Sequence, residues 1–198
     1  MYNALESFLI DLGFSWTWAK LSPYLGTLLI GYWVFNRLER LVIKNWLKYT
    51  VMGIGFCLPF LTYFAFYPIY AADLVSESFE TKTTVDHLPK QKTLAIVILP
   101  GCPYCIETIE LSKKMLRNNA KIKIQYLLAS EDQEGYLFFR KKLPKAIEVK
   151  IPKNPLLCMV MAQGEFPSYF LIAQQKVVKA WHNTHFGTKA LDEINSFF

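Results

Sequence analysis

"VILPGCPYCIETIEL", residues 97–111, places two cysteines, Cys102 and Cys105, between an apolar run and a helix-like pattern. The apolar, β-branched run TLAIVIL that leads up to the pair is typical of a strand buried on both faces. In the residues that follow, Ile106 and Ile109 recur at a spacing that puts them near one face of a helix. The stretch therefore predicts a buried strand followed by a helix whose first turn carries the cysteine pair.

A cysteine pair at the start of a helix has a specific chemical use. The unpaired N–H groups and the partial positive charge of a helix N-terminus stabilise a thiolate on Cys102. Pro103 suits the first helical turn, where a missing N–H costs nothing. Cys105 follows almost one turn later, close enough to attack a mixed disulfide formed at Cys102. We therefore predict that Cys102 is the nucleophile and Cys105 the resolving thiol of thiol–disulfide exchange.

Two other interpretations of the pair stay open. A zinc site needs four ligands, usually two such pairs or one pair with suitably spaced histidines, and this chain has one pair among its four cysteines. A structural disulfide gains little entropy from so short a loop. Redox chemistry without a bound metal or cofactor is favoured over both.

The N-terminal part of the chain is strongly apolar. Residues 49–72 contain no charged side chain, and about 20 apolar residues suffice to cross a membrane as a helix. Pro59 within this stretch predicts a kink and not a break. An upstream apolar stretch over 21–35 falls short of a full span. It can be lengthened back towards Trp16 or forwards to about residue 43, and its alternative is a helix lying in the membrane interface. We expect a membrane region over 1–74 with two transmembrane helices, about 21–43 and 49–72.

The charges around these segments predict their orientation. Beyond the second span the first charged residues are acidic, whereas the link between the spans carries one acid, Glu39, against the bases Arg37, Arg40, Lys44 and Lys48. By the positive-inside rule the link lies in the cytoplasm and both termini lie outside. The N-terminus lacks the basic region of a cleaved signal peptide. The net charge of +6 forms no clustered basic face, so we expect no nucleic-acid partner.

The rest of the chain has the pattern of one α/β domain. Residues 75–92 are polar and are expected to form a linker or a loosely paired edge strand, and 93–198 are enough for one core. Ser130, with Gln133 three residues later, matches a capping box that starts a helix. The remaining elements are a strand in 121–129, a short strand in 146–151, a short helix in 154–163, two strands joined at Gln174 and Gln175, and a closing helix in 187–198. This order predicts a sheet of mixed strand directions between helices.

A proline lies directly before the third long strand. Pro167 follows Phe166 in GEFPSYFLI, about sixty residues after the cysteines. In the cis form it would turn the chain sharply and bring the backbone of Phe166 beside the sulfurs, where it could pair with an extended substrate segment. The simpler alternative is a trans proline that begins an edge strand.

Residues 93–198 resemble the thioredoxin superfamily and, within it, membrane-anchored thioredoxin-like proteins of the TlpA and ResA type. The matching stretches are AIVILPGCPYC, the helix from Ser130, NPLLCMVMAQGEFPSYFLI and QKVVKAWH. The resemblance implies an α/β thioredoxin-like fold, with a mixed central sheet flanked by helices, after an N-terminal transmembrane helical hairpin. It implies dithiol–disulfide exchange with exported proteins in the periplasm of a bacterium, from the inner membrane. The residues that contact these substrate proteins would be Pro103, Tyr104, Phe166 and Pro167.

The sequence also departs from that superfamily. Ile96 stands where thioredoxin has a buried acid, so the usual proton acceptor for the resolving thiol is missing. Gly101 stands where these proteins commonly have tryptophan. Substrate choice and the direction of electron flow are therefore open, as is the electron donor, which could be a membrane protein.

Two functions of other classes remain as alternatives. The domain could serve for docking in an accessory subunit of a membrane complex. His182 and His185 could also join the cysteine pair around a copper ion, as in copper-delivery proteins. Cys57 and Cys158 are interpreted most simply as small buried apolar residues, although Cys57 could relay electrons from a membrane partner.

Overall fold

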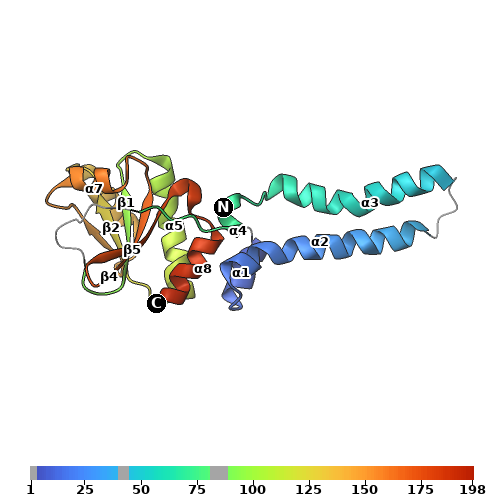
Figure 1. Cartoon of the computed structure of the whole chain (residues 1–198), viewed down its shortest axis with the longest axis horizontal. Helices are drawn as coiled ribbons and strands as arrows, with labels where there is room; N and C mark the ends of the chain where they lie inside the picture. The colour runs from blue at the N-terminus through green and yellow to red at the C-terminus, as the bar shows by residue number, and fades with distance from the viewer. Residues whose placement is uncertain (1–3, 40–44, 81–88) are drawn as a thin grey trace. The chain divides into compact units, whose positions relative to one another are not determined.

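The computed structural model describes residues 4–39, 45–80 and 89–198, and the chain divides into two compact units, Met1–Tyr70 and Ala71–Phe198 (Figure 1). The first unit is helical and the second contains the sheet. The second unit begins at Ala71, about twenty residues before the predicted strand at Thr93.

The first unit contains α1 (Ala4–Asp11), α2 (Trp16–Glu39) and α3 (Asn45–Phe66). Helices α2 and α3 lie side by side (Figure 1). They approach closely at Gly31, where a methyl group would overlap the Phe56 carbonyl, and at Gly55, where it would meet the Leu38 side chain. These two glycines therefore allow the close packing of small residues that is common between membrane helices.

Among the described helices, one is long and apolar enough to cross a membrane. It is the part of α3 from Tyr49 to Phe66, which has a mean hydropathy of 1.5 and is 6% buried. The helix continues through Pro59 but ends at Phe66, before residue 72, because Pro68 disfavours helical backbone in the residue before it.

The predicted first span is not shown. Helix α2 begins at Trp16 and, unlike α3, is not apolar enough along its length to be a candidate span. Residues 40–43 of that prediction lie outside the described residues. A hairpin of two transmembrane helices is thus reduced to one candidate span.

The second unit is built on one five-stranded sheet with the order β3-β2-β1-β4-β5. Strand β1 runs parallel to β2 and antiparallel to β4, so the sheet is mixed as predicted. Its strands are β1 (Thr93–Ile98), β2 (Ile124–Leu128), β3 (Glu148–Lys150), β4 (Ser168–Ala173) and β5 (Lys176–His182), and its helices are α4 (Ala71–Leu74), α5 (Pro103–Asn118), α6 (Gln133–Lys142), α7 (Pro155–Met161), the 3-10 turn η1 (Asn183–His185) and α8 (Thr188–Phe197).

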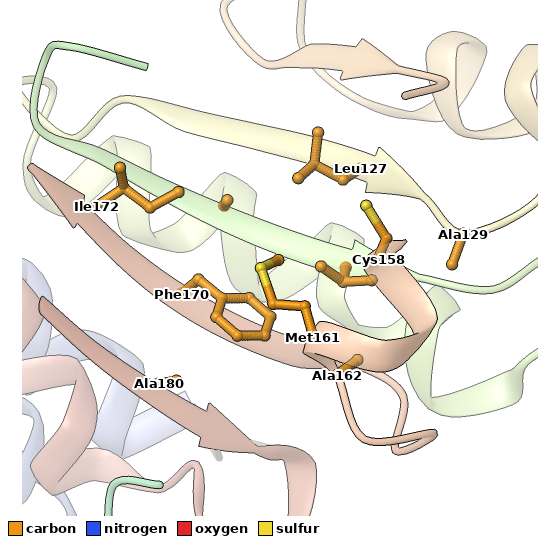
Figure 2. Packing of buried hydrophobic residues seen from close by; sticks show 10 residues of the cluster. Leu127, Ala129, Cys158, Met161, Ala162, Phe170, Ile172 and Ala180 are labelled. Carbon is orange, nitrogen blue, oxygen red and sulfur yellow. The ribbon is translucent and has the colours of Figure 1, made fainter. Parts of the chain in front are cut away.

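Helices cover both faces of the sheet, with α7 on one side and α5 and α8 on the other (Figure 1). On the α7 face, Cys158 and Met161 pack among Leu127, Phe170 and Ile172 (Figure 2). Strand β1 is buried at all six positions, as expected for a central strand covered on both faces. The α/β sandwich predicted from the sequence is confirmed.

The turn between β4 and β5 and the start of α6 show how local sequence sets these elements. Gln174 and Gln175 have φ values of 51° and 62°, which matches the tight turn expected between β4 and β5. The start of α6 was predicted at Ser130, and this is wrong. Asp132 is the N-cap, and its carboxylate accepts the Glu134 N–H at 3.0 Å. Ser130, two residues before this N-cap, instead accepts the Asp132 N–H at 3.1 Å.

The residues after the first unit pack as part of the second. Asp73 in α4 is 5% exposed, and its carboxylate accepts the Thr188 N–H at the start of α8. Gly187 has no room for a side chain beside the Ala72 backbone. Further on, Phe79 donates its N–H to the Ala180 carbonyl at 2.9 Å. The beginning of the predicted linker therefore lies along β5, and residues 81–88 of it lie outside the described residues.

Candidate active site

Cys102 occupies the N-cap of α5, directly after the turn that leaves β1. Gly101 has a φ of 74°, a conformation that glycine adopts without strain and that turns the chain into the helix. Cys102 is extended, with φ −77° and ψ 116°, and Pro103 follows at the first helical position. The Cys105 N–H points at the Cys102 sulfur, 3.3 Å away. One unpaired donor of the helix end is thereby satisfied by sulfur.

The two cysteines differ in access to solvent. Cys102 is partly exposed, whereas Cys105 is fully buried. Burial raises the pKa of the Cys105 thiol well above its ordinary value, and its hydrogen bond to Cys102 adds to this. An incoming disulfide can therefore meet the Cys102 sulfur, while Cys105 stays protonated behind it.

The loop before β4 brings a distant part of the chain to the same place. The Phe166–Pro167 peptide bond is cis. The Cys102 sulfur is 3.8 Å from the Phe166 carbonyl oxygen, to which its S–H can donate, across 64 residues of sequence. Pro167 is buried and Phe166 is half-buried. The backbone of the proline loop and the sulfur of the cysteine pair thus share one site.

The other predicted contact residues surround this point from the helix side. Pro103 is exposed, and the Tyr104 side chain is 59% exposed. Ile106, one turn into the helix, is 43% exposed and was not among the predicted contacts. The helical spacing had placed Ile106 with Ile109 on one apolar face, so spacing alone did not identify it as a surface residue beside the cysteine pair. The surface around Cys102 is therefore aromatic and apolar.

Buried hydroxyl groups form a hydrogen-bond network under α5 that the sequence analysis did not predict. Thr108 donates to the Cys105 carbonyl at 2.7 Å. Its oxygen lies 2.9 Å from the Tyr126 hydroxyl, which is 2.8 Å from the Ser112 hydroxyl. Because the Thr108 proton is used on the carbonyl, the donors run from Ser112 to Tyr126 to Thr108. Thr108 and Ser112 could have been noticed as polar residues four apart on one helix face, but their partner on β2 could not.

The structure also describes two further cysteines, Cys57 and Cys158, and the histidines His182 and His185. Cys158 is fully buried on the α7 face, as predicted, whereas Cys57 is exposed on α3, and its predicted burial is not seen. His182 contacts the proline loop through Ser168. No group of three or more potential metal ligands occurs among the described residues, so the structure gives no support to a copper site.

The strand order, the cysteine pair at the start of α5 and the cis-proline before β4 together define a thioredoxin-like α/β fold. No known family model and no curated protein matches the sequence. Among solved structures, the chain is similar to a thioredoxin-like protein from Bacteroides caccae ATCC 43185, at 14% identity and a TM-score of 0.39, over 85% of this chain and 76% of that one.

Proposed function

We propose that the protein is a membrane-anchored thiol–disulfide oxidoreductase that acts on exported proteins in the bacterial periplasm. The observation that carries the proposal is the arrangement of Cys102: partly exposed at a helix N-cap, with Cys105 buried behind it and the Phe166 carbonyl beside it. Location and anchoring rest on the apolar part of α3 and on the charges that flank it in the sequence.

The exchange proceeds in two steps. The Cys102 thiolate attacks one sulfur of a substrate disulfide, forms a mixed disulfide, and releases the other substrate sulfur as a thiolate that takes up a proton. Cys105 then loses its proton, attacks the Cys102 sulfur and releases the second substrate thiol. The substrate gains two electrons and two protons, and the chain is left with a Cys102–Cys105 disulfide. A dithiol donor must reduce this disulfide before the next cycle.

The substrate is expected to bind as an extended segment. Backbone groups at Phe166 would pair with it, while Pro103 and Tyr104 would contact its side chains. Main-chain pairing tolerates many sequences, which suits an enzyme that acts on several exported proteins.

The full-length protein in mild detergent tests the proposal. Cys102→Ser should lower the rate of insulin disulfide reduction by about a thousandfold, because the buried Cys105 sulfur cannot readily form the first bond in its place. Cys105→Ala should accumulate mixed disulfides that appear on non-reducing gels and disappear on reduction. Cys57→Ser is the matched control and should keep the wild-type rate. An unchanged rate in Cys102→Ser would contradict the proposal.

The location needs a separate measurement. In intact cells that produce the protein from its gene, a membrane-impermeant maleimide should label Cys102 once the outer membrane is permeabilised. Labelling that requires lysis of the inner membrane would place the domain in the cytoplasm instead.

A further inference from the structure

A buried histidine contacts the loop that carries the cis-proline. His182, the last residue of β5, is 7% exposed and is the register partner of Ser168, the first residue of β4. Its Nδ1 atom lies 3.1 Å from the Ser168 hydroxyl oxygen. Burial disfavours the charged form of a histidine, so an apolar side chain would fill this position at a lower cost in free energy if packing were its only role.

The hydrogen bonds have a defined direction. The Ser168 hydroxyl donates its proton to the Glu165 carbonyl at 2.7 Å. It has no second proton, so at Nδ1 it must accept, and the histidine carries its proton on that nitrogen. The chain of donors therefore runs from His182 to Ser168 to the backbone of Glu165. These hydrogen bonds tie the two ends of the 165–168 loop to each other and to β5.

Groups from other elements set the state of the ring. Phe79 stacks on His182 with ring centroids 3.8 Å apart and an angle of 3° between the planes. Burial lowers the pKa of His182, and His185 in η1 acts in the same direction, whereas the Glu165 carboxylate, 3.7 Å from Nδ1, opposes them. The lowered pKa makes the neutral ring with one donor the dominant form at neutral pH.

The same loop carries the carbonyl that lies beside the reactive sulfur. Phe166, between Glu165 and Pro167, provides the oxygen 3.8 Å from the Cys102 sulfur. A shift of the loop base would therefore move the backbone that a substrate strand would pair with, while leaving Cys102 at its helix N-cap.

We propose that His182 is a positioning residue for protein substrates: its Nδ1–H, acting through Ser168, keeps the backbone of the 165–167 loop in the arrangement that binds an extended segment next to Cys102. The proposal rests on the proposed exchange function. It separates recognition from chemistry, because attack by Cys102 on a small disulfide needs no strand pairing and so does not depend on His182.

Three variants of the full-length protein in mild detergent test this role. His182→Phe keeps an aromatic ring against Phe79 but has no donor. His182→Asn places an amide N–H close to where Nδ1 lies. His185→Phe, at a histidine whose side chain is 48% exposed, is the matched control. Each is assayed on insulin and on 2-hydroxyethyl disulfide.

We expect His182→Phe to lower kcat/KM for insulin by about fivefold to tenfold, the effect of losing one buried hydrogen bond, with most of the change in KM. Its rate on 2-hydroxyethyl disulfide should stay within about twofold of wild type. His182→Asn should recover most of the insulin activity, and His185→Phe should match wild type on both substrates.

Ser168→Ala provides a second route that leaves the histidine in place. It should reproduce the insulin defect, and the double variant with His182→Phe should be no worse than the stronger single one, because both remove the same link.

Other outcomes overturn the proposal in distinguishable ways. Three results would overturn the role of His182 and leave the exchange function intact. They are equal losses of activity on both substrates, equal defects in His182→Phe and His182→Asn, and additive defects in the double variant. A wild-type protein that reduces neither substrate overturns the exchange function together with it.

Discussion

The first turns of α5 and α7 are built alike but behave differently. Each has proline at the first helical position and a fully buried cysteine in the first two turns, Cys105 in α5 and Cys158 in α7. In α5 the N-cap is a second sulfur, that of Cys102, which accepts a backbone N–H. In α7 the N-cap is Asn154, whose side chain makes no capping hydrogen bond.

The surfaces beneath the two helices also differ. Under α5 lie the hydroxyls of Thr108, Ser112 and Tyr126, whereas Cys158 in α7 packs among apolar residues (Figure 2). Burial raises the pKa of Cys158 to about 11 with no hydrogen bond to offset it. The buried thiol of α5 thus has a partly exposed sulfur at the N-cap beside it, whereas the buried thiol of α7 has none.

The largest expected difference between the two helices is in their rates of alkylation. With iodoacetamide at pH 7.5, Cys102 should react at least about a thousandfold faster than Cys158, because Cys158 reacts only after local opening that costs several kcal/mol. Mass spectrometry of peptides after timed quenching measures both rates in one sample. Comparable rates would show that α7 opens readily and would contradict the expected difference in thiol reactivity between the two helices.

A smaller effect is expected from the hydroxyl network that only α5 has. Tyr126→Phe leaves the buried Thr108 and Ser112 hydroxyls short of a partner and should lower the free energy of unfolding by about 1–3 kcal/mol. Tyr104→Phe removes the hydroxyl of an exposed ring and serves as the control, with a change within about 0.5 kcal/mol. Urea unfolding followed by circular dichroism measures both. A neutral Tyr126→Phe would mean that the network adds no stability to α5.

Much of this comparison was visible in the sequence. The strand before the pair, the helix after it and the hairpin at Gln174 and Gln175 follow from apolar patterns and turn chemistry, which act over a few residues. The place of Cys102 and Cys105 at the start of that helix follows from the same patterns. These local features sufficed to predict the α/β sandwich and the order of its elements.

Contacts between distant segments that carry no recognisable motif could not be predicted. Tyr126 under α5, Phe79 against His182 and Asp73 at the start of α8 each join residues at least 14 positions apart. No periodicity in the chain marks such pairs. The error at Ser130 has a related cause. A capping box is a local pattern, and the sequence offers a second N-cap candidate two residues later, Asp132, which local pattern alone does not rank below Ser130.

The raised pKa of Cys158 in α7 predicts that stability depends on pH in the alkaline range. The thiol has an ordinary value of 9.0 and about 11 when folded, so its contribution to stability is complete below pH 9 and is lost as the pH rises through 11. Cys158→Ala lacks this loss. Its deficit in unfolding free energy against wild type, measured in urea, should therefore shrink by about 1 kcal/mol between pH 7 and pH 10. A deficit that stays constant would show that the folded thiol titrates normally.

The smallest effect compares the caps themselves. Cys102→Ala removes the acceptor for the Cys105 N–H, whereas Cys102→Ser keeps one, so the alanine variant should be less stable than the serine variant by about 1 kcal/mol. Asn154→Ala removes a side chain that makes no capping hydrogen bond and should change the unfolding free energy by at most a few tenths of a kcal/mol. Thermal denaturation of the three variants with wild type measures the differences. Equal stability of the alanine and serine variants would mean that the sulfur at the cap serves chemistry alone, and that α5 begins where it does because of Pro103, as α7 begins at Pro155.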